Sequence, residues 1–151
     1  VPFSVPGKIA LWLEDASQAN FGSVAEDTIA LEIRDAEGTT RAFYVPGCAS
    51  MPPELAERLR GAPLVLFDGT LWVDDEMIRD GVGAKTGDRM GHMSVSGPQG
   101  TIAAFADLDV KRKIFIHINT TNPILLDDSP QRAEVLAAGW EVSHDGMEIT
   151  L

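Results

Sequence analysis

Two apolar segments of this chain each end in a residue that could bind a metal ion or move a proton. Residues 63–67 form an apolar run that leads into Asp68, and residues 114–116 lead into His117. Such runs are typical of strands buried on both faces of a sheet, and ligands gather where these strands meet their loops. A carboxylate and an imidazole at two such ends suit a metal site or an acid–base pair. An N-capping Asp and a His at the edge of the core are the structural alternative.

Three further polar side chains lie in loops where a substrate could bind. His92 falls within the glycine-rich segment 81–97, and loops of this kind often order only with substrate. We therefore expect His92 to donate a proton or to face the substrate. Asn119 and Asn122 follow His117 in a polar stretch and are candidates for substrate binding. Their alternative role is to form Asx-type turns ahead of Pro123.

Length and composition predict one globular domain over residues 1–151. Hydrophobic residues make up 44% of the chain and its mean hydropathy is 0.00, values that exclude a disordered segment. No apolar run approaches the roughly 20 residues that cross a bilayer, so we expect no membrane partner. Twelve basic against 23 acidic residues give a net charge of −11. Such a surface repels a phosphate backbone, so nucleic acid is not an expected partner.

The termini and the cysteine content bear on the compartment. Cys48 is the single cysteine, which excludes an intrachain disulfide and a cysteine-rich zinc site. The first residues lack the charged start and apolar stretch of a signal peptide, and we expect a cytoplasmic protein. Because the chain begins at Val1 without an initiator Met, a fragment or a processed chain is expected.

The apolar pattern predicts a sheet with helices on at least one face. Turns at 35–39 and 144–146 would each close a hairpin, and Pro at the first helical position marks two helix starts. The predicted strands are 8–13, 28–34, 41–45, the runs ending at Asp68 and His117, 140–142 and 147–151. The predicted helices are 53–59, 98–108 and 131–138, with one or two helical turns within 72–79.

Sequence motifs of the common catalytic sites are absent from this chain. The sequence has no G-x-S-x-G elbow, no phosphate-binding loop, no G-x-G-x-x-G fingerprint and no H-x-H-x-D-H string of a dinuclear hydrolase. Asp68 and His117 by themselves are two ligands, which is too few for a tight metal site. Further donors must complete any metal site built on them.

Several strings, in order, resemble the C-terminal half of the pyrroloquinoline quinone (PQQ) biosynthesis protein B family. These strings are FDGTLW at 67–72, DDEM at 74–77, MGHM at 90–93, KIFIHIN at 113–119, NPIL at 122–125, and DSP at 128–130 through GWEV at 139–142 to DGMEI at 145–149. The likeness covers essentially the whole chain. It implies an α/β (α+β) fold, namely half of a metallo-β-lactamase-like αββα sandwich with a mixed sheet and helices on its outer face.

The resemblance also implies roles for individual residues. Asp68 matches the late metal-ligand carboxylate of the metallo-β-lactamase superfamily, and His117 matches its terminal metal-ligand histidine. His92 falls where related phosphodiesterases and tRNA-processing nucleases keep an active-site Gly-His. The Asp-His pair that would complete the site belongs to the N-terminal half and has no match here. A third histidine of hydrolytic relatives would lie before Thr28, where this chain has none.

These departures from the hydrolytic pattern favour one metal held by histidines and carboxylates, as in non-heme iron oxygenases. The family is thought to hydroxylate the tyrosine ring of a cross-linked Glu–Tyr precursor of PQQ with iron(II) and oxygen. A zinc-dependent hydrolase is the alternative, and a non-catalytic carrier of PQQ or its precursor is a third possibility. The expected partners are this precursor and the missing N-terminal half, or a second copy of the chain. Alone, the chain is expected to be inactive.

Overall fold

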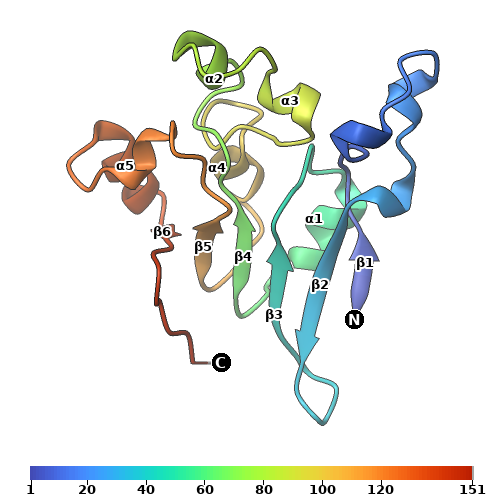
Figure 1. The fold of residues 1–151 in the computed structure, drawn as a ribbon. Coiled ribbons are helices and arrows are strands. Elements are labelled where there is room, and N and C mark those ends of the chain that lie inside the picture. The colour runs from blue at the N-terminus through green and yellow to red at the C-terminus, as the bar shows by residue number, and fades with distance from the viewer. Residues whose placement is uncertain (151) are drawn as a thin grey trace.

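One mixed sheet of six strands forms the centre of the molecule (Figure 1). The computed structural model describes residues 1–150, apart from the side chain of Leu11. The strands are β1 (Pro2–Ser4), β2 (Ile29–Arg34), β3 (Thr40–Val45), β4 (Val65–Asp68), β5 (Lys113–Ile116) and β6 (Glu141–Val142), and they lie in this order across the sheet. The pairs β1–β2 and β2–β3 are antiparallel, whereas β3, β4, β5 and β6 run parallel. The predicted mixed sheet is confirmed.

Short helices connect the parallel strands. They are α1 (Pro53–Leu59), α2 (Glu76–Arg79), α3 (Gly87–Met90), α4 (Thr101–Ala104) and α5 (Pro130–Ala137), with 3₁₀ turns η1 (Leu11–Leu13), η2 (Ala19–Gly22), η3 (Ala25–Asp27) and η4 (Pro123–Leu125). Proline at the start of α1 and of α5 suits a position whose N–H has no helical partner. Ser129 caps α5 by accepting a hydrogen bond from the Arg132 N–H.

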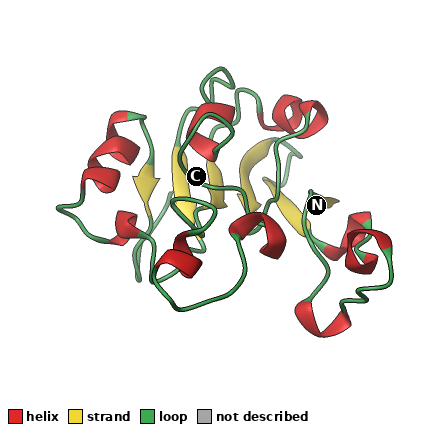
Figure 2. Ribbon diagram, turned by 90° about the horizontal axis from the view of Figure 1, so that it is seen from above, coloured by secondary structure: helices red, strands yellow, loops and turns green. Residues whose placement is uncertain are grey.

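The main hydrophobic core lies between one face of the sheet and the helices. Leu55 and Leu59 of α1 are buried against sheet residues such as Phe43 and Val65, and α1 lies behind the strands in Figure 1. Viewed from above, the strands form a single layer (Figure 2). Under β4 and β5, Phe67, Phe105, Phe115 and Trp140 form a chain of aromatic contacts, with ring centroids 4.0–4.9 Å apart. This packing fixes the two strands whose ends carry Asp68 and His117.

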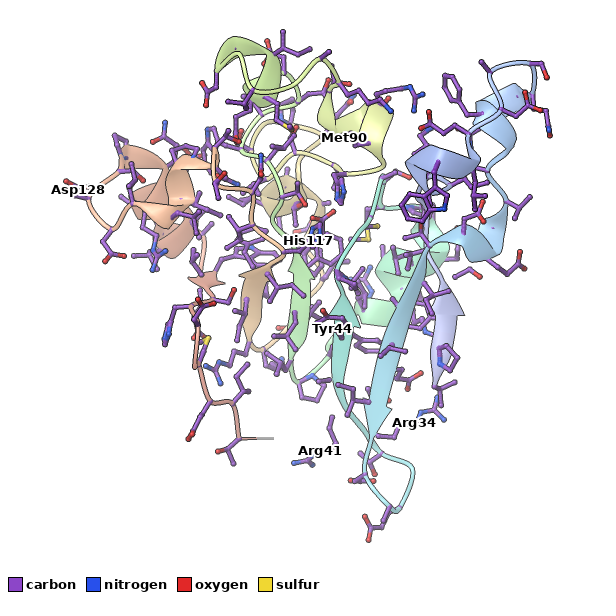
Figure 3. The ribbon with its side chains drawn as sticks, viewed as in Figure 1. Arg34, Arg41, Tyr44, Met90, His117 and Asp128 are labelled. Atoms are coloured by element: carbon purple, nitrogen blue, oxygen red, sulfur yellow. The ribbon has the colours of Figure 1, made fainter. Side chains whose placement is uncertain are left out.

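The other face of the sheet is largely open. Alternation along β2 and β3 points Ile29, Leu31, Ile33 and Tyr44 to this side, where they are 38–50% exposed, and Figure 3 labels Tyr44 on the middle of the sheet. We call these four residues the open face. Farther along the sheet, Met147 and Ile149 of the C-terminal segment pack on Ala42, Leu64 and Ile114. Among the described residues, no helix has the length and apolar character to cross a membrane.

The sequence was misleading at both ends of the chain. The predicted strand at 8–13 is wrong, because Gly7 is packed against Thr28 and the chain then leaves the sheet edge for η1. The edge strand β1 at 2–4 was missed, since three residues that start with Pro2 carry no alternating pattern. Residues 147–150 form no strand, so the predicted hairpin with 140–142 is wrong, and Leu151 lies outside the described residues. β6 instead pairs parallel with β5.

Two helix predictions need smaller corrections. The helix expected over 98–108 is the single turn α4, because residues 98–100 form a turn before Thr101 and the helix ends at Ala104. The segment 81–97, expected as a loop, contains the short helix α3. Gly91 ends α3 with a φ of +91°, a conformation that favours glycine.

An ion cluster around the buried Glu32 carboxylate links β2 to α1. Glu32 is 6% exposed, and its carboxylate accepts hydrogen bonds from Arg34, from Arg58 of α1 at 2.9 Å, and from the Thr40 hydroxyl. Arg34, then Thr40 and Arg58, outweigh the opposing effect of burial and lower the pKa of Glu32 from 4.5 to about 2. A depressed pKa in the folded state means that the cluster stabilises the fold above pH 4.5.

Replacing Glu32 by Gln should therefore lower the free energy of unfolding by about 1.5–3 kcal/mol at pH 7, the usual contribution of hydrogen bonds to a charged group. The difference from wild type should stay constant down to about pH 5 and shrink below pH 4.5, as the unfolded chain takes up the proton first. Urea unfolding of the complete polypeptide at several pH values measures this. Glu57→Gln is the matched control, because the Glu57 side chain is 74% exposed and its pair with Arg60 should contribute under about 1 kcal/mol. An equal decrease in the free energy of unfolding in the two variants would contradict a stabilising role of the Glu32 cluster.

Candidate metal centre

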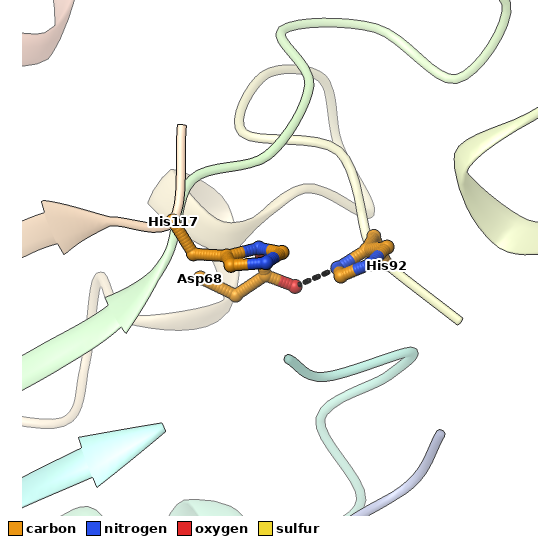
Figure 4. A group of neighbouring side chains, drawn as sticks. All are labelled: Asp68, His92 and His117. Carbon is orange, nitrogen blue, oxygen red and sulfur yellow. Dashed lines mark hydrogen bonds and ion pairs between the residues drawn. The ribbon is translucent and has the colours of Figure 1, made fainter. Parts of the chain in front are cut away.

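Parallel pairing of β4 and β5 brings Asp68 and His117 together. Asp68 is the last residue of β4 and pairs with Ile116, the last residue of β5. His117 follows at once, so both side chains leave the sheet at the carboxyl ends of the strands (Figure 4). The Nδ1 atom of His117 lies 3.8 Å from Oδ1 of Asp68. The two candidate residues at the ends of the apolar runs therefore lie close together.

Close packing under Asp68 explains the residue that follows it. A Cβ atom on Gly69 would lie 2.9 Å from the Cβ of Phe115, a distance that real Cβ atoms do not show. Glycine therefore lets the β4–β5 pair stay in register while the chain turns out of β4. The turn carries Thr70, whose N–H and hydroxyl both point back to the Asp68 carboxylate.

Asp68 is a fully buried carboxylate with every acceptor site in use. Its Oδ2 atom accepts hydrogen bonds from the Cys48 N–H at 3.0 Å and from Nδ1 of His92 at 2.6 Å. Its Oδ1 atom accepts from the Thr70 N–H at 3.1 Å and from the Thr70 hydroxyl at 2.6 Å. Two oxygens offer about four lone-pair sites. A metal ion bound to this carboxylate therefore takes the place of one of these donors.

His117 sits in an unusual backbone conformation at the end of β5. Its φ is +52°, in the left-handed region that non-glycine residues seldom adopt. This turn directs the imidazole, 53% exposed, over Asp68 instead of along the strand. The Asn119 N–H donates to the carbonyl of Thr70 at 3.0 Å, which holds the loop after His117 against the loop after Asp68. Outliers of this kind concentrate at functional sites.

His92 reaches the same point from the loop after α3. Its backbone N–H bonds to the Gly87 carbonyl, and the next residue, Met93, donates to the carbonyl of Cys48. The ring lies nearly parallel to that of His117, with centroids 5.3 Å apart and an interplanar angle of 20°. Of the donors to Asp68, His92 acts through its side chain, Cys48 through its backbone N–H, and Thr70 through both. Since His92 belongs to a loop rather than to the strand end, it is the donor with most freedom to leave.

Asp68, His92 and His117 together form a set of metal donors. One nitrogen of each histidine and one carboxylate oxygen all lie within 4.8 Å of one another. Imidazole and carboxylate suit both Zn(II) and Fe(II), so the residues present fit such an ion. The sequence predicted Asp68 and His117 as ligands and His92 as a catalytic group. The geometry adds a third donor, and the division of roles among the three stays a prediction.

The charges of the group reinforce one another. Burial alone would raise the pKa of the Asp68 carboxyl, but the imidazoles of His117 and His92 and the Thr70 hydroxyl outweigh it, and this pKa lies below its ordinary value. The Asp68 carboxylate in turn raises the pKa of His117 above its ordinary value, against the effect of partial burial. Asp68 is therefore ionised at neutral pH, as a metal ligand must be. Burial raises the pKa of the Cys48 thiol to about 12, so this cysteine is a packing residue.

A polar cavity opens beside His92. Its volume is about 490 Å³, and its lining includes His92, Ser94, Ser96, Gln99 and Asp74. Cavities of this size accept small organic molecules. His92 is 17% exposed and is the member of the donor set that lines this cavity. The cavity makes His92 accessible to a small molecule.

The two asparagines differ in what they could offer a substrate. Asn122 is 1% exposed; its Nδ2 donates to the Gly69 carbonyl and its Oδ1 accepts from the Ile124 N–H, so it caps η4. Both polar atoms of the Asn122 side chain are thus engaged in the turn, and a substrate contact by Asn122 stays an untested prediction. Asn119 is half-buried and donates to the Thr121 hydroxyl. Its substrate contact stays a prediction.

Comparison with known proteins identifies the fold family. The model of the beta-lactamase superfamily domain matches residues 8–118. The chain belongs to this superfamily. A coenzyme PQQ synthesis protein B of Xanthomonas oryzae is 57% identical over 99% of this chain, and one of Gluconacetobacter diazotrophicus is 59% identical over 99%. The chain spans 50% and 48% of the length of these two proteins.

A solved structure extends the likeness to three dimensions. The crystal structure of Zn(2+)-bound PqqB from Methylobacterium extorquens matches 99% of this chain and 49% of its own, with a TM-score of 0.91 and 51% sequence identity. The resemblance to PQQ biosynthesis protein B noted in the sequence is thereby confirmed. So is the fold class, a half of the superfamily's sandwich with a mixed sheet.

Replacing His117 by Ala should abolish metal binding with little loss of stability. The reason is that the ring is 53% exposed and makes few core contacts while offering a ligand nitrogen. Metal content by mass spectrometry and the thermal midpoint of the complete polypeptide measure the two effects. Normal metal content in the variant would remove His117 from the ligand set.

Replacing His92 by Ala should leave metal content at least as high as in wild type and lower turnover. The variant removes a hydrogen bond to Oδ2 of Asp68 that would compete with a metal ion for this carboxylate, and it also removes the imidazole beside the cavity. The same two assays with His144→Ala, an exposed histidine outside the donor set, provide the control. Parallel loss of metal and turnover in His92→Ala would make His92 a ligand instead.

Proposed function

We propose that this chain is part of an enzyme of PQQ biosynthesis that uses iron(II) and oxygen to hydroxylate the tyrosine ring of a cross-linked Glu–Tyr precursor. The observation that carries the proposal is the buried Asp68 carboxylate with two imidazoles around it at the carboxyl ends of β4 and β5. The names of relatives at 57–59% identity support the pathway. Histidine and carboxylate donors, joined by further donors from the rest of a longer polypeptide, are the ligand types of non-heme iron oxygenases, and this supports the reaction class.

Each residue of the site has a distinct task in this proposal. Asp68 and His117 hold the ion, and further donors come from the rest of a longer polypeptide. His92 exchanges protons with the substrate in the cavity, through the ring nitrogen not bonded to Asp68. The bound iron supplies oxygen activation. Asn119, on the loop after His117, contacts the substrate. The Asp68 side chain is fully buried, so bulk water does not reach its carboxylate.

A zinc-dependent hydrolase is the second candidate. The observation that favours it is the zinc ion named in the related PqqB structure, since imidazole and carboxylate also suit zinc. In that case the bound ion would polarise water for attack on an ester or lactone. His92 would then protonate the leaving group, a role that its position beside the cavity equally allows.

Metal content and oxygen uptake of the complete polypeptide separate these candidates. With Fe(II) restored and the cross-linked precursor as substrate, we expect oxygen uptake in proportion to hydroxylated product, and none after Zn(II) replaces Fe(II). Cleavage of phosphodiesters or lactones by the zinc form without oxygen uptake would support the hydrolase. Tight binding of precursor with neither reaction would support a carrier and would refute the hydroxylase.

We also propose that the rest of a longer polypeptide covers the open face. The apolar residues Ile29, Leu31, Ile33 and Tyr44 lie side by side on β2 and β3, and the chain spans half the length of its relatives. Contiguous apolar surface of this kind marks an interface. Because side chains alternate along a strand, Asp68 points to the same side of β4 as Leu66. A covering segment would therefore also be placed to complete the metal site.

The 151-residue chain alone should accordingly self-associate and show no turnover. Leu31→Glu with Ile33→Glu should shift it toward monomer in size-exclusion chromatography with light scattering. Leu136→Glu on α5 is the matched control, because Leu136 is also exposed, at 54%, but lies outside the open face. A monomeric, fully active wild-type chain would contradict the proposal.

A further inference from the structure

Thr70 is at the centre of the candidate metal site although it is not itself a charged or metal-binding group. Its hydroxyl oxygen lies 2.6 Å from Oδ1 of Asp68, 2.8 Å from Nδ1 of His117 and 3.1 Å from Nδ1 of His92. It also lies 3.0 Å from the carbonyl oxygen of His117. Thr70 is 7% exposed, so its hydroxyl has these groups as its partners.

The single hydroxyl proton restricts how these contacts can be made. A hydroxyl donates one hydrogen bond and accepts up to two. The 2.6 Å contact with the ionised Asp68 is the shortest and is charge-assisted, so the proton belongs there. The hydroxyl can then only accept from His117, which requires a proton on Nδ1 of that ring. His92 has its own acceptor in Oδ2 of Asp68 at 2.6 Å.

This arrangement determines which nitrogen of His117 is available to a metal. A neutral imidazole with its proton on Nδ1 carries its lone pair on Nε2. We propose that Thr70 is a positioning residue that fixes His117 in the Nδ1-protonated tautomer and so presents Nε2 to the ion. The inference rests on the metal site of the proposed function but on neither its substrate nor its reaction.

The backbone of Thr70 supports the same role. Its N–H donates to Oδ1 of Asp68, and its carbonyl accepts from the Asn119 N–H two residues beyond His117. Thr70 therefore links the carboxylate, the imidazole and the loop that sustains the left-handed turn at His117. Groups that hold the second nitrogen of a liganding histidine typically change metal affinity by about 10–100-fold when removed.

The direct test is the tautomer of His117 in the metal-free complete polypeptide. Nitrogen-15 NMR of labelled histidine, at a pH where the ring is neutral, distinguishes Nδ1–H from Nε2–H, and His117→Ala assigns the signal. We expect Nδ1–H in the wild type and a mixture of tautomers in Thr70→Val. A wild-type His117 protonated on Nε2 would overturn the proposal, whether or not the variant folds.

Metal affinity gives a second, independent readout. Zn(II) competition with a chelator should show about 10–100-fold weaker binding for Thr70→Val, which keeps the side-chain shape, and recovery to within about threefold for Thr70→Ser, which keeps the hydroxyl. Thr121→Val is the matched control, because its hydroxyl lies in the loop after His117 but bonds Asn119 and Glu76. It should bind Zn(II) like wild type. Equal losses in Thr70→Val and Thr121→Val, or no loss in Thr70→Val, would refute the positioning role.

These outcomes are distinguishable from failure of the proposed function. A hydrolase or a carrier would still show the tautomer and the affinity pattern, because neither measurement involves a substrate. If the wild-type polypeptide bound no Zn(II) at all, the metal centre itself would be refuted together with this inference.

Discussion

A buried carboxylate is the constraint on which the site depends. An ionised group removed from water is costly unless donors surround it, and Asp68 is 0% exposed. Four hydrogen bonds meet it, from the backbone of Cys48 and Thr70 and from the side chains of Thr70 and His92. The chain segments that supply these donors come from after β3, after β4 and after α3. The hydrogen bonds to the Asp68 carboxylate thus hold three loops together at one edge of the sheet.

The rest of the fold holds the strand ends beneath that charge. The aromatic contacts of Phe67, Phe115 and Trp140 pack β4 and β5 against the helices on one face. Glycine at 69 lets the two strands stay in close register under Asp68. Fewer residues pack on the opposite face of the sheet. The open face lies there, and the Asp68 side chain points to the same side. One face of the sheet is covered by helices and the other is partly uncovered. Both features are consistent with half of a two-sheet sandwich.

The sequence predicted those parts of the structure that local pattern controls. Apolar runs located β4 and β5, and the polar residues at their ends identified Asp68 and His117. Periodicity failed where the interaction is not local: β1 has three residues and is a strand because it pairs with β2, and residues 147–150 pack on the sheet without joining it. Thr70 was missed because a threonine after Asp-Gly carries no signal of its own. Its position between the His92 and His117 rings depends on the left-handed backbone conformation of His117. No residue pattern predicts that conformation.

The position of a bound metal ion tests the account most directly. Crystals of the complete polypeptide loaded with Fe(II) or Zn(II) should give one anomalous difference peak in this half of the molecule. It should lie about 2.0–2.2 Å from an Asp68 oxygen and from Nε2 of His117, the usual ligand distances, with the Thr70 hydroxyl still bonded to Nδ1. A peak away from Asp68, or one bound by Nδ1 of His117, would contradict the site as described.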